Sequence, residues 1–117
     1  MATYKAKGSG YFPANTKMEG GEKDARGNQL RTLQDFLKGN VTYVSCAMDK
    51  TVQSKFHGTK IQIPELDKKY GKAIEFRVVD TGGAFKGKGY TRIDICTASS
   101  ADSVEPTING WLTLVFP

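Results

Sequence analysis

The sequence predicts a single, mostly β domain built as a small β barrel. Five or six short segments alternate apolar with polar residues and are rich in β-branched and aromatic side chains, as half-buried strands are. Turn segments separate them and only one stretch has helical spacing, unlike the regular strand–helix alternation of a parallel α/β sheet. A chain of 117 residues can bury one modest core, so we expect one domain over residues 1–117.

The expected elements follow in chain order. A first strand over residues 3–12 precedes an irregular loop over residues 13–29 that is rich in Gly, Asn and charge. Four apolar residues between positions 30 and 37 have helical spacing, and Gly39-Asn40 is a typical stop, so a short amphipathic helix is expected there. Further strands are expected over residues 41–48, 58–64, 72–80, 91–97 and 111–116.

Charge and hydropathy narrow the classes of partner. The net charge of +5 favours a polyanionic partner, but the basic residues are scattered and Lys68-Lys69 is the one adjacent pair. We therefore expect no nucleic-acid partner, whereas a bacterial cell wall carries carboxylates and phosphates that attract cationic proteins. No apolar run reaches the roughly 18 to 20 residues that span a bilayer, and the first residues lack the apolar centre of a secretory signal. We expect a monomer without membrane insertion, and its localisation stays open.

The cysteines and the histidine do not predict a metal site. Cys46, Cys96 and His57 could supply at most three ligands, and no CxxC spacing occurs. We expect neither a metal nor an organic cofactor, and we interpret His57 as structural. Both cysteines lie in strand-like segments, so they are either buried thiols or a disulfide between adjacent strands.

Three aspartates stand beside apolar, strand-like segments, although Asp is a poor strand residue. They are Asp49, Asp80 and Asp94. One interpretation is turn formation at strand ends. The other is a set of neighbouring carboxylates, in which repulsion raises one pKa until that group can act as a general acid. The other aspartates have polar neighbours and are expected on the solvated surface: Asp24, Asp35, Asp67 and Asp102.

Residues 78–95, "VVDTGGAFKGKGYTRIDI", resemble the signature of the three-aspartate ("3D") domain family of bacteria and their phages. The segments "YVSCAMDK" (43–50) and "FHGTKIQIPEL" (56–66) are similar to two further family segments, and residues 11–30 resemble the N-terminal loop of phage-associated members. The resemblance implies a six-stranded double-psi β barrel with one or two short helices. It also implies that the three aspartates meet at one groove.

The resemblance further implies cleavage of peptidoglycan. The catalytic domain of membrane-bound lytic transglycosylase A carries a similar D-x-GGAIKG…D motif, whose second aspartate corresponds to Asp94. Asp94 would protonate the leaving oxygen of the β-1,4 bond and then accept the proton of the muramyl C6 hydroxyl, which gives a 1,6-anhydro product. Asp80 would orient Asp94 and raise its pKa, and Asp49 completes the catalytic set. The residues expected to bind or line the saccharide groove are Tyr11, Glu19, Thr81, Gly82, Gly83, Lys86 and Tyr90.

The sequence departs from the family pattern at several positions. The link between Gly87 and Arg92 is longer than usual, which could present Tyr90 to substrate. Lys50 follows Asp49 where proline is common, and His57 stands where a leucine-like residue is usual.

Two other functions fit the same residues. An inverting hydrolase of a β-1,4-linked polysaccharide would use two carboxylates about 6.5 to 9.5 Å apart with a water between them. Related barrels of the expansin type bind glycans without efficient cleavage, and a shared fold does not fix an activity.

Overall fold

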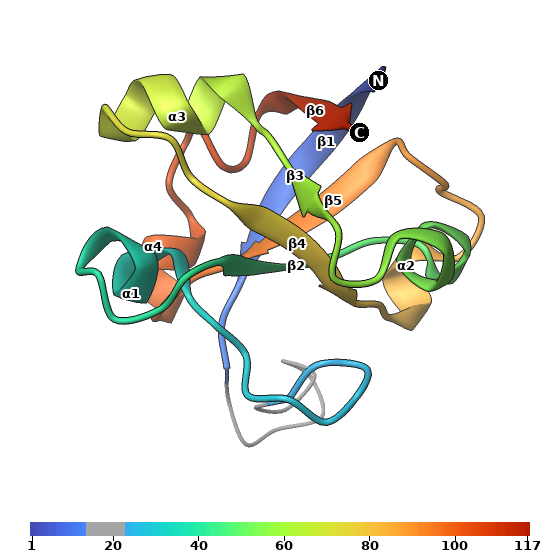
Figure 1. Cartoon of the computed structure of the whole chain (residues 1–117), viewed down its shortest axis with the longest axis horizontal. Helices are drawn as coiled ribbons and strands as arrows, with labels where there is room; N and C mark the ends of the chain where they lie inside the picture. The colour runs from blue at the N-terminus through green and yellow to red at the C-terminus, as the bar shows by residue number, and fades with distance from the viewer. Residues whose placement is uncertain (14–22) are drawn as a thin grey trace.

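The computed structural model describes residues 1–13 and 23–117, and a six-stranded sheet with the order β3-β4-β2-β5-β1-β6 dominates it. The strands are β1 (Ala2–Tyr11), β2 (Val44–Ala47), β3 (Lys60–Ile61), β4 (Phe76–Asp80), β5 (Arg92–Cys96) and β6 (Trp111–Phe116). The sheet nearly closes on itself (Figure 1). The mostly β, six-stranded barrel expected from the sequence is therefore confirmed.

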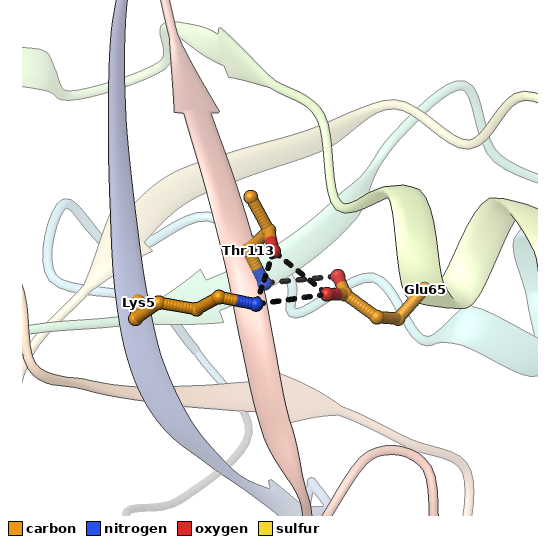
Figure 2. Close-up of polar contacts among 3 residues, drawn as sticks. All are labelled: Lys5, Glu65 and Thr113. Carbon is orange, nitrogen blue, oxygen red and sulfur yellow. Dashed lines mark hydrogen bonds and ion pairs between the residues drawn. The ribbon is translucent and has the colours of Figure 1, made fainter.

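Contacts between the two end strands, β3 and β6, close the barrel. Gln62 and Val115 exchange backbone hydrogen bonds of 3.1 and 2.9 Å. The Glu65 carboxylate accepts the backbone N–H of Thr113 at 2.9 Å and its hydroxyl at 2.7 Å. The Lys5 ammonium donates to the same hydroxyl and lies 3.6 Å from the carboxylate (Figure 2). These groups occupy the edge of β6 that would otherwise be left unpaired.

The middle of the sheet mixes parallel and antiparallel pairs. β1 runs parallel to β5, and β2 runs parallel to β4, whereas β2 and β5 are antiparallel. Parallel neighbours require long crossover connections, and these bring segments far apart in the sequence together. Ala2 of β1 lies opposite Phe116 of β6, so the two chain ends are adjacent (Figure 1).

Apolar side chains on the inner face of every strand form one core. Its largest fully buried members include Phe76, Phe116, Met48, Ile93 and Ile95. β1 contributes little bulk, because a Cβ at Gly8 would lie 2.2 Å from the Ile108 carbonyl oxygen, and one at Gly10 2.4 Å from that of Ser103. The glycines of "GSG" therefore let the chain before β6 pack directly on β1.

In the described ranges four short α-helices surround the barrel, where one or two were expected. They are α1 (Leu33–Leu37), α2 (Lys50–Phe56), α3 (Pro64–Tyr70) and α4 (Ser100–Ser103). α1 begins later than the apolar pattern predicts, because the Thr32 hydroxyl accepts the Asp35 N–H as an N-cap. α3 shortens the expected strand over residues 58–64, since Pro64 starts the helix. No helix in the described ranges is both long and apolar enough to cross a membrane.

Candidate active site

Four residues line up across the four central strands of the sheet. Ala47 of β2 lies opposite Asp80 of β4 on one side and opposite Asp94 of β5 on the other. Asp94 in turn lies opposite Ser9 of β1. Side chains of directly paired residues point to the same face of a sheet. Asp80 and Asp94 are thus two strand spacings apart, roughly 9 to 10 Å between Cα atoms, with the single methyl group of Ala47 between them.

This row lies on the outer face of the barrel. Ile93 and Ile95 are fully buried in the core, so Asp94 between them points outward and is half-buried. On β4 the simple alternation is broken: the register shifts by one residue, and Val78 and Val79 are both buried. The shift is a β-bulge, which re-aims the residue after it. Without the bulge, Asp80 would share the inward face of Val78.

The Asp94 carboxyl holds its proton more tightly than an ordinary aspartate. Burial raises its pKa, while the hydrogen bond donated by the Ser9 hydroxyl to Oδ1 and the charge of Arg92 partly oppose that rise. Among the described residues, the Ser9 hydroxyl is the hydrogen-bond partner of the Asp94 side chain, so its second oxygen can carry a proton. A carboxylic acid of this kind is what general acid catalysis requires.

The Asp80 carboxyl is shifted in the same direction. Burial raises its pKa to about 6, although the Thr81 N–H, 2.9 Å from Oδ1, stabilises the charged form. The nearby charge of Asp24 adds to the rise. Repulsion between Asp80 and Asp94 is not among the causes for either group. The expectation that these two carboxylates perturb each other is therefore wrong, because Ala47 separates them, and burial has the main effect.

Asp49 has a different environment from the other two. It is the N-cap of α2, where Oδ1 accepts the Thr51 N–H at 3.0 Å, and Oδ2 accepts the Gly89 N–H at 2.9 Å. The backbone N–H of Gly89 and that of Thr51 lower its pKa, so Asp49 stays charged. This carboxylate joins the start of α2 to the glycine-rich loop between β4 and β5.

That loop forms one wall of a pocket of about 770 Å³. The pocket brings together Asp49 and four residues expected to bind the saccharide: Thr81, Gly82, Gly83 and Lys86. A short 3-10 turn over Gly83–Phe85 fixes the loop through the buried ring of Phe85. Gly87 and Gly89 adopt positive φ angles of 77° and 54°, which glycine accommodates without strain.

A second hollow of about 560 Å³ contains Asp80 itself. Its wall includes Arg26 and Gln53, and it shares Lys50 and Thr81 with the larger pocket. The two hollows therefore adjoin, and Asp80 is reached from the side of the loop that carries Thr81.

Tyr11 lies close to Asp80 and Asp94, the two carboxyl groups whose pKa values are raised. It is paired with Cys96 of β5, one step along the outer face from Asp94. Its hydroxyl is buried and has no hydrogen-bond partner in the described part of the chain. Burial raises the pKa of this phenol well above its usual range, and the charges of Cys96, Asp80 and Asp94 add to the effect. Tyr11 therefore stays protonated.

The other two expected binding residues are placed differently. Tyr90 stacks on Tyr4 with ring centroids 3.9 Å apart and packs edge-on against Phe116 at 5.4 Å. Its ring belongs to this aromatic cluster, and Tyr90 is not among the residues that line the pocket beside Asp49. Glu19 lies outside the described residues.

Asp24 was expected on the solvated surface, and that expectation is wrong: only 7% of it is exposed. Its Oδ1 accepts the N–H groups of Arg26 and Asn28 at 2.9 and 3.0 Å, which folds a tight turn. The N–H of Ala25 bonds to the carbonyl of Val79 at 3.2 Å and so fastens this turn to the bulge of β4. The sequence signal is the turn pattern "DARGN", but nothing local shows that the turn packs against Asp80.

The two cysteines are free thiols. Cys46 belongs to the core and lies opposite Ile95, whereas Cys96 lies one position further along β5. Neighbouring positions of a strand point to opposite faces, so the two thiols are directed to opposite sides of the sheet. This explains why adjacency of the strands does not produce a disulfide.

A scan against protein-family models finds no match for this chain, and a search of curated proteins finds no matching relative. Within residues 1–13 and 23–117, no three His, Cys, Asp or Glu side chains gather closely enough to hold a metal ion. The features that point to a function are therefore the geometry of the outer face and the motif in residues 78–95.

Proposed function

We propose that this protein cleaves the β-1,4 glycosidic bonds of peptidoglycan glycan strands by a lytic-transglycosylase-like mechanism. The observation that carries the proposal is the pair Asp80 and Asp94, two carboxyls on one face whose pKa values are both raised. Breaking a glycosidic bond needs a carboxylic acid that still holds a proton near neutral pH. The resemblance of residues 78–95 to the three-aspartate domain supplies the substrate class.

In this mechanism Asp94 acts first as an acid and then as a base. Its proton goes to the bridging oxygen as the bond from that oxygen to C1 of the muramyl residue breaks. The resulting carboxylate then accepts the proton of the C6 hydroxyl while the C6 oxygen bonds to C1. The product is a 1,6-anhydro sugar, no water is consumed, and Asp94 ends protonated as it began.

The surrounding residues would bind and orient the strand. Gly82 and Gly83 present backbone without side chains, so a saccharide can approach their peptide groups closely. The Lys86 ammonium and the Thr81 hydroxyl lie on the same wall and can reach ring hydroxyls. Asp80, at the end of that wall, would stabilise positive charge that develops on the sugar ring when it is ionised.

One observation favours a second candidate, an inverting hydrolase. Two strand spacings place the Cα atoms of Asp80 and Asp94 roughly 9 to 10 Å apart. Side chains that lean toward each other from there bring the carboxyls into the range of about 6.5 to 9.5 Å that inverting enzymes use. In that case Asp80 would be the base that activates a water.

Product analysis separates the candidates. Purified peptidoglycan is digested with the wild-type protein and with Asp94→Asn, and the fragments are identified by mass spectrometry. We expect 1,6-anhydromuramic ends from the wild type alone. Reducing ends instead would establish hydrolysis with two working carboxylates. No product from peptidoglycan, chitin or cellulose would refute both enzymes and leave a glycan-binding barrel.

A matched variant controls for the general effect of replacing a carboxyl group by an amide. Asp35 lies in α1, and Asp35→Asn makes the same side-chain replacement as Asp94→Asn. Asp35→Asn should release the same products at the wild-type rate.

A further inference from the structure

A second row of side chains lies on the same outer face, beside the row formed by Asp80, Ala47, Asp94 and Ser9. Lys7 of β1 is paired with Trp111 of β6 on one side and with Arg92 of β5 on the other. Lys7 precedes Ser9 by two residues, and Arg92 precedes Asp94 by two. Positions two apart on a strand share a face and are separated by roughly 7 Å. Arg92 in this row is therefore roughly 7 Å from Asp94 along β5, which is about the length of one sugar residue.

This row lines a hollow of about 680 Å³. Lys88 from the β4–β5 loop adds to its wall, and so does Ser9, whose hydroxyl binds the Asp94 carboxylate. Ser9 thus links the hollow to Asp94, and the hollow shares no lining residue with the pocket beside Asp49.

Trp111 gives the hollow an apolar wall. It is 64% exposed, which makes it one of three large hydrophobic residues in the described ranges that face solvent. The apolar C–H face of a pyranose ring packs well on an indole, whose N–H can also donate to a hydroxyl. An exposed aromatic ring next to polar donors is a typical sugar-binding arrangement.

Among the described residues, no carboxylate forms an ion pair with a cation of this hollow, although the charge of Arg92 acts on the nearby Asp94. The ion pairs in the described part of the chain use other basic residues: Lys5, Lys69 and Arg77. Lys7 donates to the carbonyl oxygen of Asn109, and the Arg92 guanidinium lies 5.6 Å from the centroid of the Phe85 ring. Lys88 is exposed. Three like charges around one hollow repel each other and create a positive potential that a bound anion would relieve.

We propose that the hollow formed by Trp111, Lys7, Arg92 and Lys88 is a subsite for a sugar residue that carries an anionic substituent. The ring packs on Trp111, and the substituent is held by the three cations. As an extension of the site at Asp94, the subsite rests on the proposed glycan cleavage. The protein would then also recognise the glycan by the charge on a sugar next to the bond that is cleaved. The anion can be the carboxylate of a muramic acid or the phosphate of a phosphorylated sugar.

Trp111 is the one tryptophan of the chain, so its fluorescence reports this hollow directly. The wild-type protein is titrated with N-acetylmuramic acid, N-acetylglucosamine and N-acetylglucosamine 6-phosphate. The first two differ in a lactyl carboxylate, and none has a glycosidic bond between sugars to cleave. We expect an anionic sugar to bind roughly tenfold more tightly than the neutral one, the gain from one charge-assisted contact. Which anionic sugar binds more tightly identifies the substituent as carboxylate or phosphate.

Variants test whether the named cations cause this preference. Arg92→Gln and Lys88→Gln should each weaken binding of the anionic sugar several-fold and leave the neutral sugar unchanged. Lys38→Gln removes the same charge at the exposed end of α1 and should change neither. Equal affinity for neutral and anionic sugars, or no change in Trp111 fluorescence with any of them, would overturn the proposal.

These titrations are independent of cleavage. If the fluorescence preference is found but peptidoglycan is not cleaved, the subsite stands and the proposed enzyme fails. If peptidoglycan is cleaved through Asp94 but Trp111 does not respond, the enzyme stands and the subsite fails.

Discussion

The three aspartates that the sequence groups together occupy two different environments. Asp49 accepts backbone N–H groups from a helix start and from a glycine-rich loop, and its pKa is lowered. Asp80 and Asp94 lie half-buried on the strands, each with few donors, and their pKa values are raised. Hydrogen-bond donors favour a charged carboxylate and burial disfavours it, so one group stays ionised and the other two can hold protons. We therefore expect Asp49 to stabilise the fold, and the proposed acid chemistry rests on Asp80 and Asp94.

The largest expected effect is on catalysis at Asp94. Asp94→Asn removes the proton donor and almost no volume, and loss of a general acid–base group costs roughly 10² to 10⁴ in rate. The rate of release of soluble fragments from peptidoglycan measures this. The melting temperature should be no lower than for the wild type, because the amide fills the same space as the acid and cannot acquire the charge that burial disfavours. Wild-type cleavage by Asp94→Asn would contradict the assignment.

Replacement of Asp49 should mainly lower the stability of the fold, whereas replacement of Asp94 mainly lowers activity. Asp49→Ala leaves α2 without its cap and releases the N–H of Gly89, so the melting temperature at pH 7 should fall clearly. A lowered pKa means that the charged carboxylate stabilises the fold above its unfolded pKa near 3.8, and that this contribution disappears as pH falls through the folded pKa. The difference in melting temperature between Asp49→Ala and the wild type should therefore become smaller as the solution is acidified.

Ser99→Ala is the matched control for Asp49→Ala. It removes the N-cap of α4, where the Ser99 hydroxyl accepts the Asp102 N–H at 3.2 Å without a contact to a distant loop. Its effect on melting should be smaller. Equal effects would mean that the contact between Asp49 and Gly89 contributes nothing.

Asp80 should show the reverse pH dependence of stability. Because its folded pKa is raised from 3.8 to about 6, its contribution to stability is fully present below 3.8 and is lost as pH rises to about 6. Asp80→Asn removes this loss. Its melting temperature relative to the wild type should increase from pH 4 to pH 6 and then stay level. A difference that is constant over that interval would show that Asp80 titrates normally.

The smallest effect is expected from Ser9. Its hydroxyl lowers the pKa of Asp94, so Ser9→Ala should raise that pKa further. Activity that needs protonated Asp94 declines as pH rises through this value. The alkaline limb of the pH–rate profile should therefore move to higher pH while the maximum rate changes little. A shift to lower pH would show that the Ser9 hydroxyl does not stabilise the carboxylate.

The sequence predicts the barrel well because strand alternation and core positions depend on local pattern. It predicts the helices less well, although Pro64 at the start of α3 and Gly71 at its left-handed end are recognisable signals. The outward position of Asp80 could not be predicted, since it depends on a bulge that only pairing with β2 reveals. The buried position of Asp24 depends in the same way on a turn packing against a strand 55 residues later in the sequence.

The difference between the two environments can be measured directly by carbon-13 NMR titration of the aspartate side-chain carboxyls. We predict a pKa near 6 for Asp80, a value above the ordinary range for Asp94, and one below 3.8 for Asp49. Asp80→Asn, Asp94→Asn and Asp49→Asn assign the three resonances. If all three carboxyls titrate together near 3.8, neither strand aspartate holds a proton near neutral pH, and the proposed acid catalysis at Asp94 is contradicted.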